Sequence, residues 1–292
     1  MIWVFGYFLP MPELPEVEVL VRHLRPLVRN KTIRRVEVRR ARVISPTPLR
    51  EFQHVLKGAK ITGLSRRGKF LLFQLQTRRG RKSVTLLGHL GMTGRMFLAR
   101  RSAPLPKHAA VVFGLGRENF IYEDQRYFGR LTLDDSTVAK LGPEPLGEDF
   151  STDSLAVALK RSRRAIKVKL LDQALVAGIG NIYASEALFR ARISPRIAAC
   201  RLTRAQVGRL WRAIRDVLAT AIRLGSTIPL NFSDADGDGL FYFGRAADAP
   251  DFYEERLRVY DRRGKPCVRC GTAIKRIVQA ARSTFYCPKC QR

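Results

Sequence analysis

The spacing of apolar residues changes twice along the chain, and each change marks a different kind of structure. Apolar side chains recur every three or four residues over 14–29, with charged residues between them, which predicts an amphipathic helix. Short runs of β-branched and aromatic residues follow, bounded by glycine and basic turns: Thr32–Ile44, Ile61–Leu64, Phe70–Gln76, Val84–Leu87, Arg95–Leu98, Ala110–Phe113, Phe120–Tyr122 and Arg130–Leu133. Many short strands with closely spaced turns are typical of an antiparallel sandwich or barrel.

The second change follows residues 141–150, which are rich in Gly and Pro and predict a linker. Beyond it, helical spacing predicts helices over 152–160, 163–175, 182–191 and 203–223, the last with Thr203 as its N-cap. A stretch rich in Gly, Asp and Ala, 225–250, predicts a long loop. We therefore expect an N-terminal extension, a β domain, a linker, a helical domain and a terminal module, with bounds 1–11, 12–140, 141–150, 151–255 and 256–292.

The net charge of the chain indicates the kind of partner that it binds. The chain has 292 residues, with 54 Lys and Arg against 25 Asp and Glu, for a net charge of +29. An excess of this size favours a polyanion such as nucleic acid, although a generally basic proteome would also raise it. No apolar run reaches the roughly 18 residues of a membrane span, so we expect no membrane partner.

Four cysteines near the end of the chain form two pairs, Cys267 with Cys270 and Cys287 with Cys290. Paired Cys-x-x-Cys knuckles can surround a tetrahedral zinc ion with four thiolates, which predicts one structural Zn²⁺. The alternative is a redox dithiol pair or free thiols. The fifth cysteine, Cys200, stands alone and is expected to be an incidental thiol. Reduced cysteines favour a cytoplasmic location.

The start of the chain contains a second methionine, Met11, directly before Pro12. The ten residues before it carry no charge and lack the features of a signal peptide. If the chain began at Pro12, its secondary amine would be free to form an iminium with a sugar carbon. If the extension were retained, the same nitrogen would be an unreactive amide. Pro12 and Pro15 can also be explained as residues that only mark a helix start.

Two further motifs surround glycines with functional side chains. Residues 178–186 place two glycines before Asn181 and a helical run, which suits phosphate binding or an ordinary packing corner. Residues 88–94 and 124–129 place Met92 and Phe128 on loops between strands, where large side chains can wedge between bases or simply join the core.

Taken together and in this order, the motifs resemble the formamidopyrimidine-DNA glycosylase family, and the resemblance runs from Met11 to Arg292. The segments that carry it are 12–18, 89–94, 142–146, 178–186 and the four-cysteine tail. The family implies an α+β fold: an N-terminal helix on an antiparallel β-sandwich, then a helix–two-turn–helix domain and a zinc-finger hairpin. It also implies a monomer that acts on double-stranded DNA with oxidised bases, in the cytoplasm at the nucleoid, without an organic cofactor.

The resemblance implies a role for individual residues. Pro12 would attack C1′ of the damaged nucleotide, Glu13 would protonate the sugar oxygen, and Glu16 would lie near the same site. Lys69 would hold a phosphate beside the lesion. The other residues implied to contact DNA are His89, Met92, Arg126, Phe128, Lys167, Asn181 and Arg282. Met92, Arg126 and Phe128 would fill the stack left by the flipped base, Asn181 and Arg282 would clamp phosphate, and His89 would contact the backbone or pack.

Two departures from the family pattern stand out. The family usually has Pro-Arg-Arg-Phe after Asp124, whereas this chain has Gln125-Arg-Tyr-Phe128. The 225–253 loop, which caps the lesion in the family, is longer than usual, so the preference among lesions stays open. Three alternatives remain: a non-catalytic binder of damaged DNA if residues 1–11 are retained, an endonuclease VIII-like enzyme for oxidised pyrimidines, and a basic zinc-ribbon factor.

Overall fold

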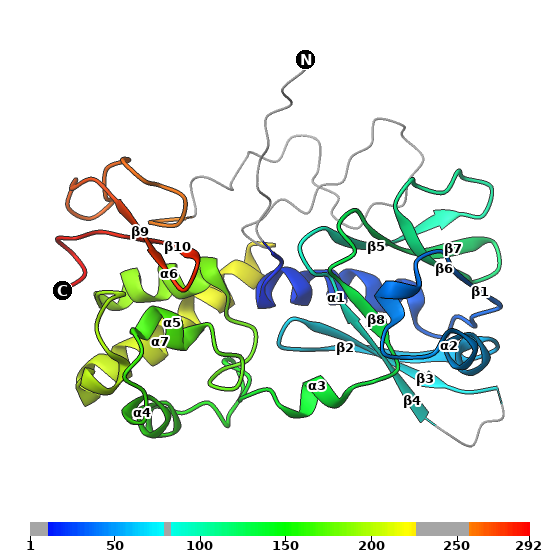
Figure 1. The fold of residues 1–292 in the computed structure, drawn as a ribbon, viewed down its shortest axis with the longest axis horizontal. Coiled ribbons are helices and arrows are strands. Elements are labelled where there is room, and N and C mark those ends of the chain that lie inside the picture. The colour runs from blue at the N-terminus through cyan, green and yellow to red at the C-terminus, as the bar shows by residue number, and fades with distance from the viewer. Residues whose placement is uncertain (1–10, 79–82, 226–256) are drawn as a thin grey trace, which may run out of the picture.

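The computed structural model describes residues 11–78, 83–225 and 257–292. Two lobes lie side by side, and the N-terminal helix α1 (Leu14–Val28) runs from their junction into the first lobe (Figure 1). The expectations about residues 1–10 and about the long loop after Gly225 lie outside the described residues. None of the described helices combines the length and the apolar character needed to cross a membrane.

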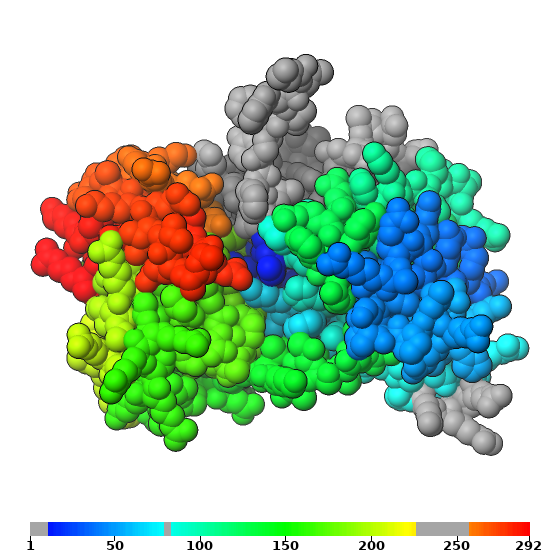
Figure 2. Space-filling view, in the orientation of Figure 1, coloured from blue at the N-terminus to red at the C-terminus, as the bar shows by residue number. Residues whose placement is uncertain are grey.

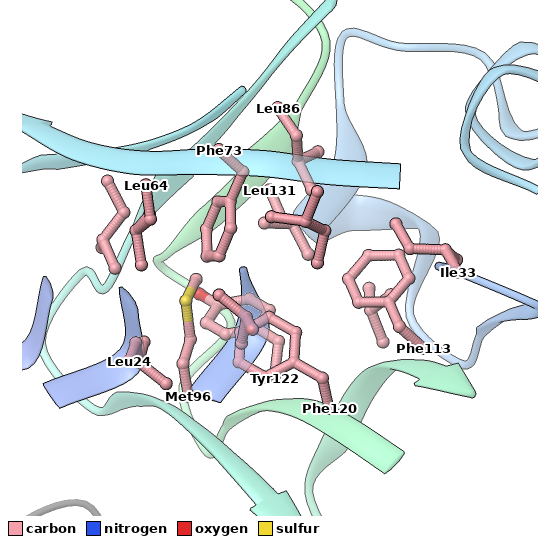
Figure 3. Close-up of a cluster of buried hydrophobic side chains, with 14 of the residues drawn as sticks. Leu24, Ile33, Leu64, Phe73, Leu86, Met96, Phe113, Phe120, Tyr122 and Leu131 are labelled. Carbon is pink, nitrogen blue, oxygen red and sulfur yellow. The ribbon is translucent and has the colours of Figure 1, made fainter. Parts of the chain in front are cut away.

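The first lobe is an antiparallel sandwich of two four-stranded sheets, ordered β1-β6-β7-β5 and β2-β3-β4-β8. Its strands are β1 (Arg35–Val38), β2 (Lys60–Arg67), β3 (Phe70–Gln76), β4 (Ser83–His89), β5 (Gly94–Arg100), β6 (Ala109–Gly114), β7 (Glu118–Asp124) and β8 (Arg130–Thr132). The two sheets meet through large side chains: the rings of Phe73 and Phe120 lie 5.6 Å apart between them (Figure 3). Burial of this apolar layer is the main stabilising term of the lobe.

Helix α1 covers one end of the sandwich because every third or fourth residue is apolar. Val17, Val21, Leu24 and Val28 are buried in the core of the first lobe. Pro15 lies in the first turn of the helix, where its missing N–H has no partner to lose. The predicted helix is therefore confirmed.

The second lobe packs helices α4 (Thr152–Lys160), α5 (Ile166–Leu170), α6 (Asn181–Ala191) and α7 (Arg204–Arg223) around its own apolar core. Thr203 is the N-cap of α7, since its side chain accepts a hydrogen bond from the backbone of Gln206, as the sequence predicts. The short helix α3 (Ser136–Ala139) lies on the connection between the lobes (Figure 1). The hairpin β9 (Lys275–Gln279) and β10 (Arg282–Tyr286) stands on α6.

Two predicted elements differ from the structure, and one helix was not predicted. The run 32–44 is not one strand: β1 ends at Val38, because the next two N–H groups both turn to the carbonyl of Ala110, and a 3₁₀ turn follows at Ala41–Ile44. Helix α2 (Leu49–Leu56) was not predicted, although Phe52 and Leu56 are spaced for one buried face.

The predicted helix 163–175 is reduced to the five residues of α5. Beyond it, side chains satisfy the backbone in place of a helix: the Asp172 carboxylate accepts from the N–H of Ala174, and the Gln173 amide oxygen accepts from the N–H of Gly178. Asp and Gln compete with helical hydrogen bonds in this way, which is why the apolar periodicity overestimated the helix.

Candidate active site

Glu13 lies where helix α6 begins, although the two segments are far apart in the chain. Its carboxylate accepts hydrogen bonds from the N–H groups of Gly180 at 2.7 Å, Ile182 at 2.8 Å and Tyr183 at 3.3 Å. These are the free donors of a helix N-terminus, which favours an anion. A Cβ at position 180 would lie 2.3 Å from the Glu13 carboxyl carbon, so only glycine admits the contact.

This arrangement bears on the two interpretations of residues 178–186 that the sequence left open, a phosphate site and a packing corner. Glycines before a helix suggested a phosphate site at residues 178–186. The N–H groups that would bind the phosphate already bind the carboxylate of Glu13, so the end of α6 holds an anion from the protein itself.

Glu16 fixes the orientation of Glu13. One Glu16 oxygen accepts from the backbone N–H of Glu13 at 2.8 Å, and the other accepts from the hydroxyl of Tyr183 at 2.6 Å. Glu16 is completely buried. These two contacts tie Glu16, which the resemblance places near the catalytic site, to the backbone of Glu13 and to Tyr183.

Pro12 is buried at the junction of the lobes, directly before Glu13. The N–H of Leu14 donates to the carbonyl of Gly178 at 3.0 Å, which ties the start of α1 to the second lobe. In the space-filling view, the start of α1 lies at the bottom of a hollow between the terminal hairpin and the sandwich (Figure 2). The expected nucleophile and acid directly precede this helix in the chain.

Lys69 follows the turn between β2 and β3 and lies near the same carboxylates. Burial lowers its pKa, the charges of Glu13 and Glu16 raise it, and that of Arg282 lowers it, with burial dominant. The predicted site residues of three separate segments are therefore close enough for their charges to interact: Glu13, Glu16, Lys69 and Arg282. A phosphate placed beside Lys69 would favour its ammonium form.

Glu144 holds the turn that carries Lys69. One Glu144 oxygen accepts from the N–H of Gly68 at 2.6 Å and from the Arg67 guanidinium at 2.9 Å, and the other lies 2.8 Å from the Arg66 guanidinium. Glu144 belongs to the predicted linker, so the segment between the lobes positions a site residue. The sequence analysis assigned Glu144 no function. The available indication was an acidic residue in the linker that could pair with the adjacent Arg66 and Arg67.

Lys167 and Asn181 are joined directly. The Lys167 ammonium donates to the Asn181 side-chain oxygen at 2.6 Å, and the Asn181 amide donates to the carbonyl of Ser283 at 2.9 Å. Lys167 is fully buried, and burial lowers its pKa to about 8. Lys167 belongs to a run of basic residues over 160–169, and its ammonium turns inward to Asn181.

Arg282 is exposed at the start of β10, on the hairpin tip. Ala280 and Ala281, which form the turn before it, both have positive φ values of 47° and 58°. Two such residues give the tight turn that matches the twist of a two-stranded hairpin, at a steric cost for alanine. The turn therefore fixes where the Arg282 guanidinium leaves the protein.

Met92, Arg126 and Phe128 come together on the adjacent surface of the first lobe. The Arg126 guanidinium lies 4.7 Å from the centre of the Phe128 ring and donates to the Met92 sulfur at 3.4 Å. Phe128 is 46% exposed, which is unusual for a large aromatic ring. The two loops thus form the single exposed group that the wedge hypothesis requires.

Asp124, buried and without an assigned role in the sequence analysis, orders both loops. Its carboxylate accepts from the Thr93 hydroxyl at 2.6 Å, from the N–H of Gly129 at 2.8 Å and from the N–H of Arg126 at 3.1 Å. The sequence feature that could have indicated this role is an acidic residue shortly before an Arg-aromatic-Phe-Gly sequence. At the position that departs from the family pattern, Tyr127 adopts φ 53° and its hydroxyl accepts from Arg40.

His89 packs beneath the wedge. Its Nδ1 accepts from the N–H of Gly91 at 3.1 Å, and its ring lies 4.8 Å from that of Phe70. Burial, together with the charges of Lys69 and Arg130, lowers the pKa of His89 to about 4, against an opposing effect of Asp124. The ring is therefore neutral near pH 7, and packing and turn formation account for it.

The four cysteine sulfurs of the hairpin module lie within 4.8 Å of one another. The Sγ atoms of Cys267 and Cys290 are 3.9 Å apart, and those of Cys270 and Cys287 are 3.5 Å apart. A tetrahedral Zn–S₄ centre requires sulfur separations of about 3.8 Å, so the cysteines fit one zinc ion. N–H groups of the knuckles donate to Cys267 and Cys287 sulfurs at 3.4 Å, which suits thiolates.

Three family models match successive parts of the chain. Residues 11–131 match the formamidopyrimidine-DNA glycosylase N-terminal domain, residues 141–232 match the formamidopyrimidine-DNA glycosylase H2TH domain, and residues 264–292 match a zinc finger found in FPG and IleRS. Together these matches cover most of the chain.

Whole relatives match as well. A formamidopyrimidine-DNA glycosylase of Thermus thermophilus is 43% identical over 288 residues, which is 96% of this chain and 98% of the relative. A Lactococcus lactis FPG mutant in complex with Fapy-dG containing DNA superimposes with a TM-score of 0.84 at 34% identity, covering 96% of this chain and 100% of that chain. MutM in complex with carbocyclic 8-oxo-G containing DNA gives 0.83 at 34% identity, with 96% and 100% covered.

Proposed function

The chain belongs to the formamidopyrimidine-DNA glycosylase family, and from this premise we propose how its own residues carry out the reaction. It is a DNA glycosylase with abasic-site lyase activity. It excises oxidised purines, formamidopyrimidines and 8-oxoguanine, from double-stranded DNA. The names of the matching relatives favour this activity over the endonuclease VIII-like alternative.

The observation that carries the residue assignments is the position of Glu13, buried beside Pro12 and held by three N–H groups of α6. In the proposed mechanism the Glu13 carboxylate takes a proton from the Pro12 ammonium, which frees the amine. The amine attacks C1′, and the bond from C1′ to the base breaks with its electrons going to the base, which takes up the proton left on the Pro12 nitrogen. Glu13 then returns its own proton to the ring oxygen. The sugar opens as an iminium on Pro12, and β- and δ-elimination then cut the strand.

The remaining site residues are proposed to hold the DNA. Lys69, Asn181 and Arg282 converge from three segments and would grip the phosphates around the flipped nucleotide. Lys167 would position Asn181 through their 2.6 Å hydrogen bond. Met92, Arg126 and Phe128 would enter the vacated stack, since they already form one exposed group.

The zinc ion is structural, because four cysteines fill its coordination sphere and leave no position for substrate. The proposed domain bounds are a β domain over 12–140, a linker over 141–150, a helical domain over 151–255 and the hairpin module over 256–292. We place the enzyme in the bacterial cytoplasm at the nucleoid and expect one copy to act on each lesion. The matching relatives are bacterial proteins.

A borohydride-trapping experiment tests the mechanism. Protein that begins at Pro12 is mixed with a duplex containing 8-oxoguanine or an abasic site and reduced with borohydride. We expect a covalent adduct whose peptide map places the DNA on Pro12. Glu13→Gln removes the proton carrier and is expected to lower excision of 8-oxoguanine by at least about a hundredfold. The exposed Glu51→Gln is the matched control, and its rate should equal that of the parent.

The same experiment decides the alternative of a non-catalytic binder. Protein that retains residues 1–11 has an amide at Pro12 and is expected to bind the abasic duplex without forming an adduct. The mass of the natively expressed protein then tells which form exists; the family match that begins at residue 11 supports removal of the extension. Absence of an adduct with the Pro12 form on every lesion would refute the assignment of Pro12.

A further inference from the structure

A cavity of about 640 Å³ lies in the first lobe, away from the active site. Five cationic side chains and one buried amide line it: Lys31, Arg34, Arg35, Arg101, Arg117 and Asn119. The lesion wedge and the cavity lie at opposite ends of β5. That strand starts at Gly94, two residues after Met92, and ends at Arg100, beside Arg101. Six steps along a strand span roughly 20 Å, so the cavity and the wedge are separate surfaces.

Backbone hydrogen bonds connect the segments that form the cavity. The N–H of Arg34 donates to the carbonyl of Gly114 at 2.8 Å, and the N–H of Arg101 donates to the carbonyl of Arg117 at 3.0 Å. The turn between β6 and β7 closes with a bond from Leu115 to Glu118 at 2.8 Å. The cations therefore project from a rigid frame.

The charges of the cavity are not balanced. Among the described lining residues the one carboxylate is that of Glu118, which pairs with Lys31 at 2.9 Å. Within the described parts of the chain, Arg34, Arg101 and Arg117 form no ion pair with any carboxylate. Like charges gathered in a concave site raise the local potential and attract an anion.

Asn119 supplies an independent observation. It is 3% exposed, and among the described residues its side-chain oxygen has neither a hydrogen-bond partner nor appreciable exposed surface. The oxygen therefore belongs to the polar wall of the cavity and not to its open space.

We propose that this cavity is a second phosphate-binding site, in which Arg34, Arg101 and Arg117 bind the phosphate oxygens. Arginine forks match the oxygens of phosphate, and the volume is within the range of small-ligand sites. The phosphate can belong to a free nucleotide-sized anion or to DNA that extends beyond the lesion. The chemistry is the same, and the experiment separates the two sources.

Titration calorimetry with inorganic pyrophosphate tests the site. The cleft is first saturated with an abasic-analogue hairpin that has about four base pairs on each side, roughly 14 Å, too short to reach the cavity. We expect one pyrophosphate to bind per chain. Arg34→Ala with Arg117→Ala should weaken this binding at least about tenfold, as loss of charged hydrogen bonds requires. The matched control, Arg50→Ala with Arg212→Ala, removes two exposed arginines outside the cavity and should change it less than twofold.

The DNA source is tested with an abasic-analogue duplex of about 24 base pairs, whose arms can span the distance. If flanking DNA fills the cavity, the long duplex displaces pyrophosphate, and the cavity variant lowers the salt dependence of long-duplex binding by about two counterions. Either result supports the site. The proposal is overturned if pyrophosphate binds parent and cavity variant equally or not at all and the salt dependence is also equal. Borohydride trapping on the short hairpin should be the same for all variants, so failure here is separable from failure of the catalytic assignment.

Discussion

At the scale of single residues, the site depends on hydrogen bonds between segments that are distant in the chain. Glu13 and Tyr183 are 170 positions apart, and the Glu16 carboxylate joins them by accepting from both. The resemblance to a family identified the acids of the first turn, but not what holds them. Their partners are backbone N–H groups, which carry no residue-specific signal in a sequence.

His89 gives a pH-dependent prediction at this scale. Its pKa is about 4 in the folded protein against an ordinary 6.5. Between these values the unfolded chain binds a proton that the folded chain does not, so the free energy of unfolding falls as the pH falls from about 6.5 to about 4. We expect His89 to account for about 1–3 kcal/mol of that loss. Urea unfolding of the parent and of His89→Gln, between about pH 7 and pH 4.5, measures it.

The variant should show a shallower decline than the parent, because glutamine does not titrate and can still accept from Gly91. Other groups titrate in the same range, but they are common to both proteins and cancel in the difference. His54→Gln is the control, since His54 is exposed on α2 and should leave the decline unchanged. Parallel curves for the parent and His89→Gln would show that the ring titrates freely in the folded state.

At the scale of elements, one buried amide links a zinc ligand of the terminal module to the segment that follows α6. The Gln291 side chain accepts from the N–H of Cys287 at 2.9 Å and donates to the carbonyl of Ile193 at 3.0 Å, and it is 3% exposed. It links a zinc ligand to the segment that follows α6. The hairpin carries Arg282, so the zinc module and the DNA clamp depend on the same contact.

Gln291→Ala is therefore expected to weaken both the retention of zinc and the binding of DNA. Loss of a buried hydrogen-bonding side chain costs about 1–3 kcal/mol, so zinc should transfer to a colorimetric chelator several times faster than from the parent. Affinity for an abasic-analogue duplex should fall with it, while the far lobe keeps its unfolding midpoint. Lys289→Ala, an exposed change in the same knuckle, serves as the control. Unchanged zinc release in Gln291→Ala would mean that the four thiolates hold the module without α6.

The sequence predicted elements best where one periodicity ran without interruption. The helix over 152–160 and the paired knuckles around the hairpin are confirmed, because capping, spacing and cysteine chemistry all act locally. The helix over 163–175 was wrong, since Asp172 and Gln173 replace helical hydrogen bonds with side-chain ones. Roles that need two segments, such as that of Glu144 at the Lys69 turn, could not be predicted from either segment alone.

At the scale of the whole molecule, helix α1 belongs to both lobes. Most of its apolar residues lie in the core of the first lobe, but Leu14 is buried in the core of the second. The nucleophile and acid therefore stand where two cores meet, and a shift of one lobe relative to the other moves them. The net charge of +29 is compatible with this junction because the lobes face a polyanion, which screens their repulsion when bound.

Gly178 is a point of close contact at this junction. Its φ is 86°, and a Cβ there would lie 2.6 Å from the Cβ of Leu14. Gly178→Ala should lose about 1–2 kcal/mol from the left-handed conformation and a further 1–3 kcal/mol, roughly, from the clash. Because the clash pushes on the residue two positions after Pro12, the rate of adduct formation should also fall by at least about tenfold.

Gly264→Ala separates the two effects. Gly264 has a similar φ of 78°, and nothing lies within 4 Å of a Cβ there, so it reports the conformational cost alone. We expect it to unfold more easily than the parent, yet to be trapped on abasic DNA at the parental rate. If Gly178→Ala and Gly264→Ala lose equal stability and trap equally fast, Leu14 can move without disturbing Pro12. A larger loss confined to Gly178→Ala means that the packing between the lobes sets the position of the reacting amine.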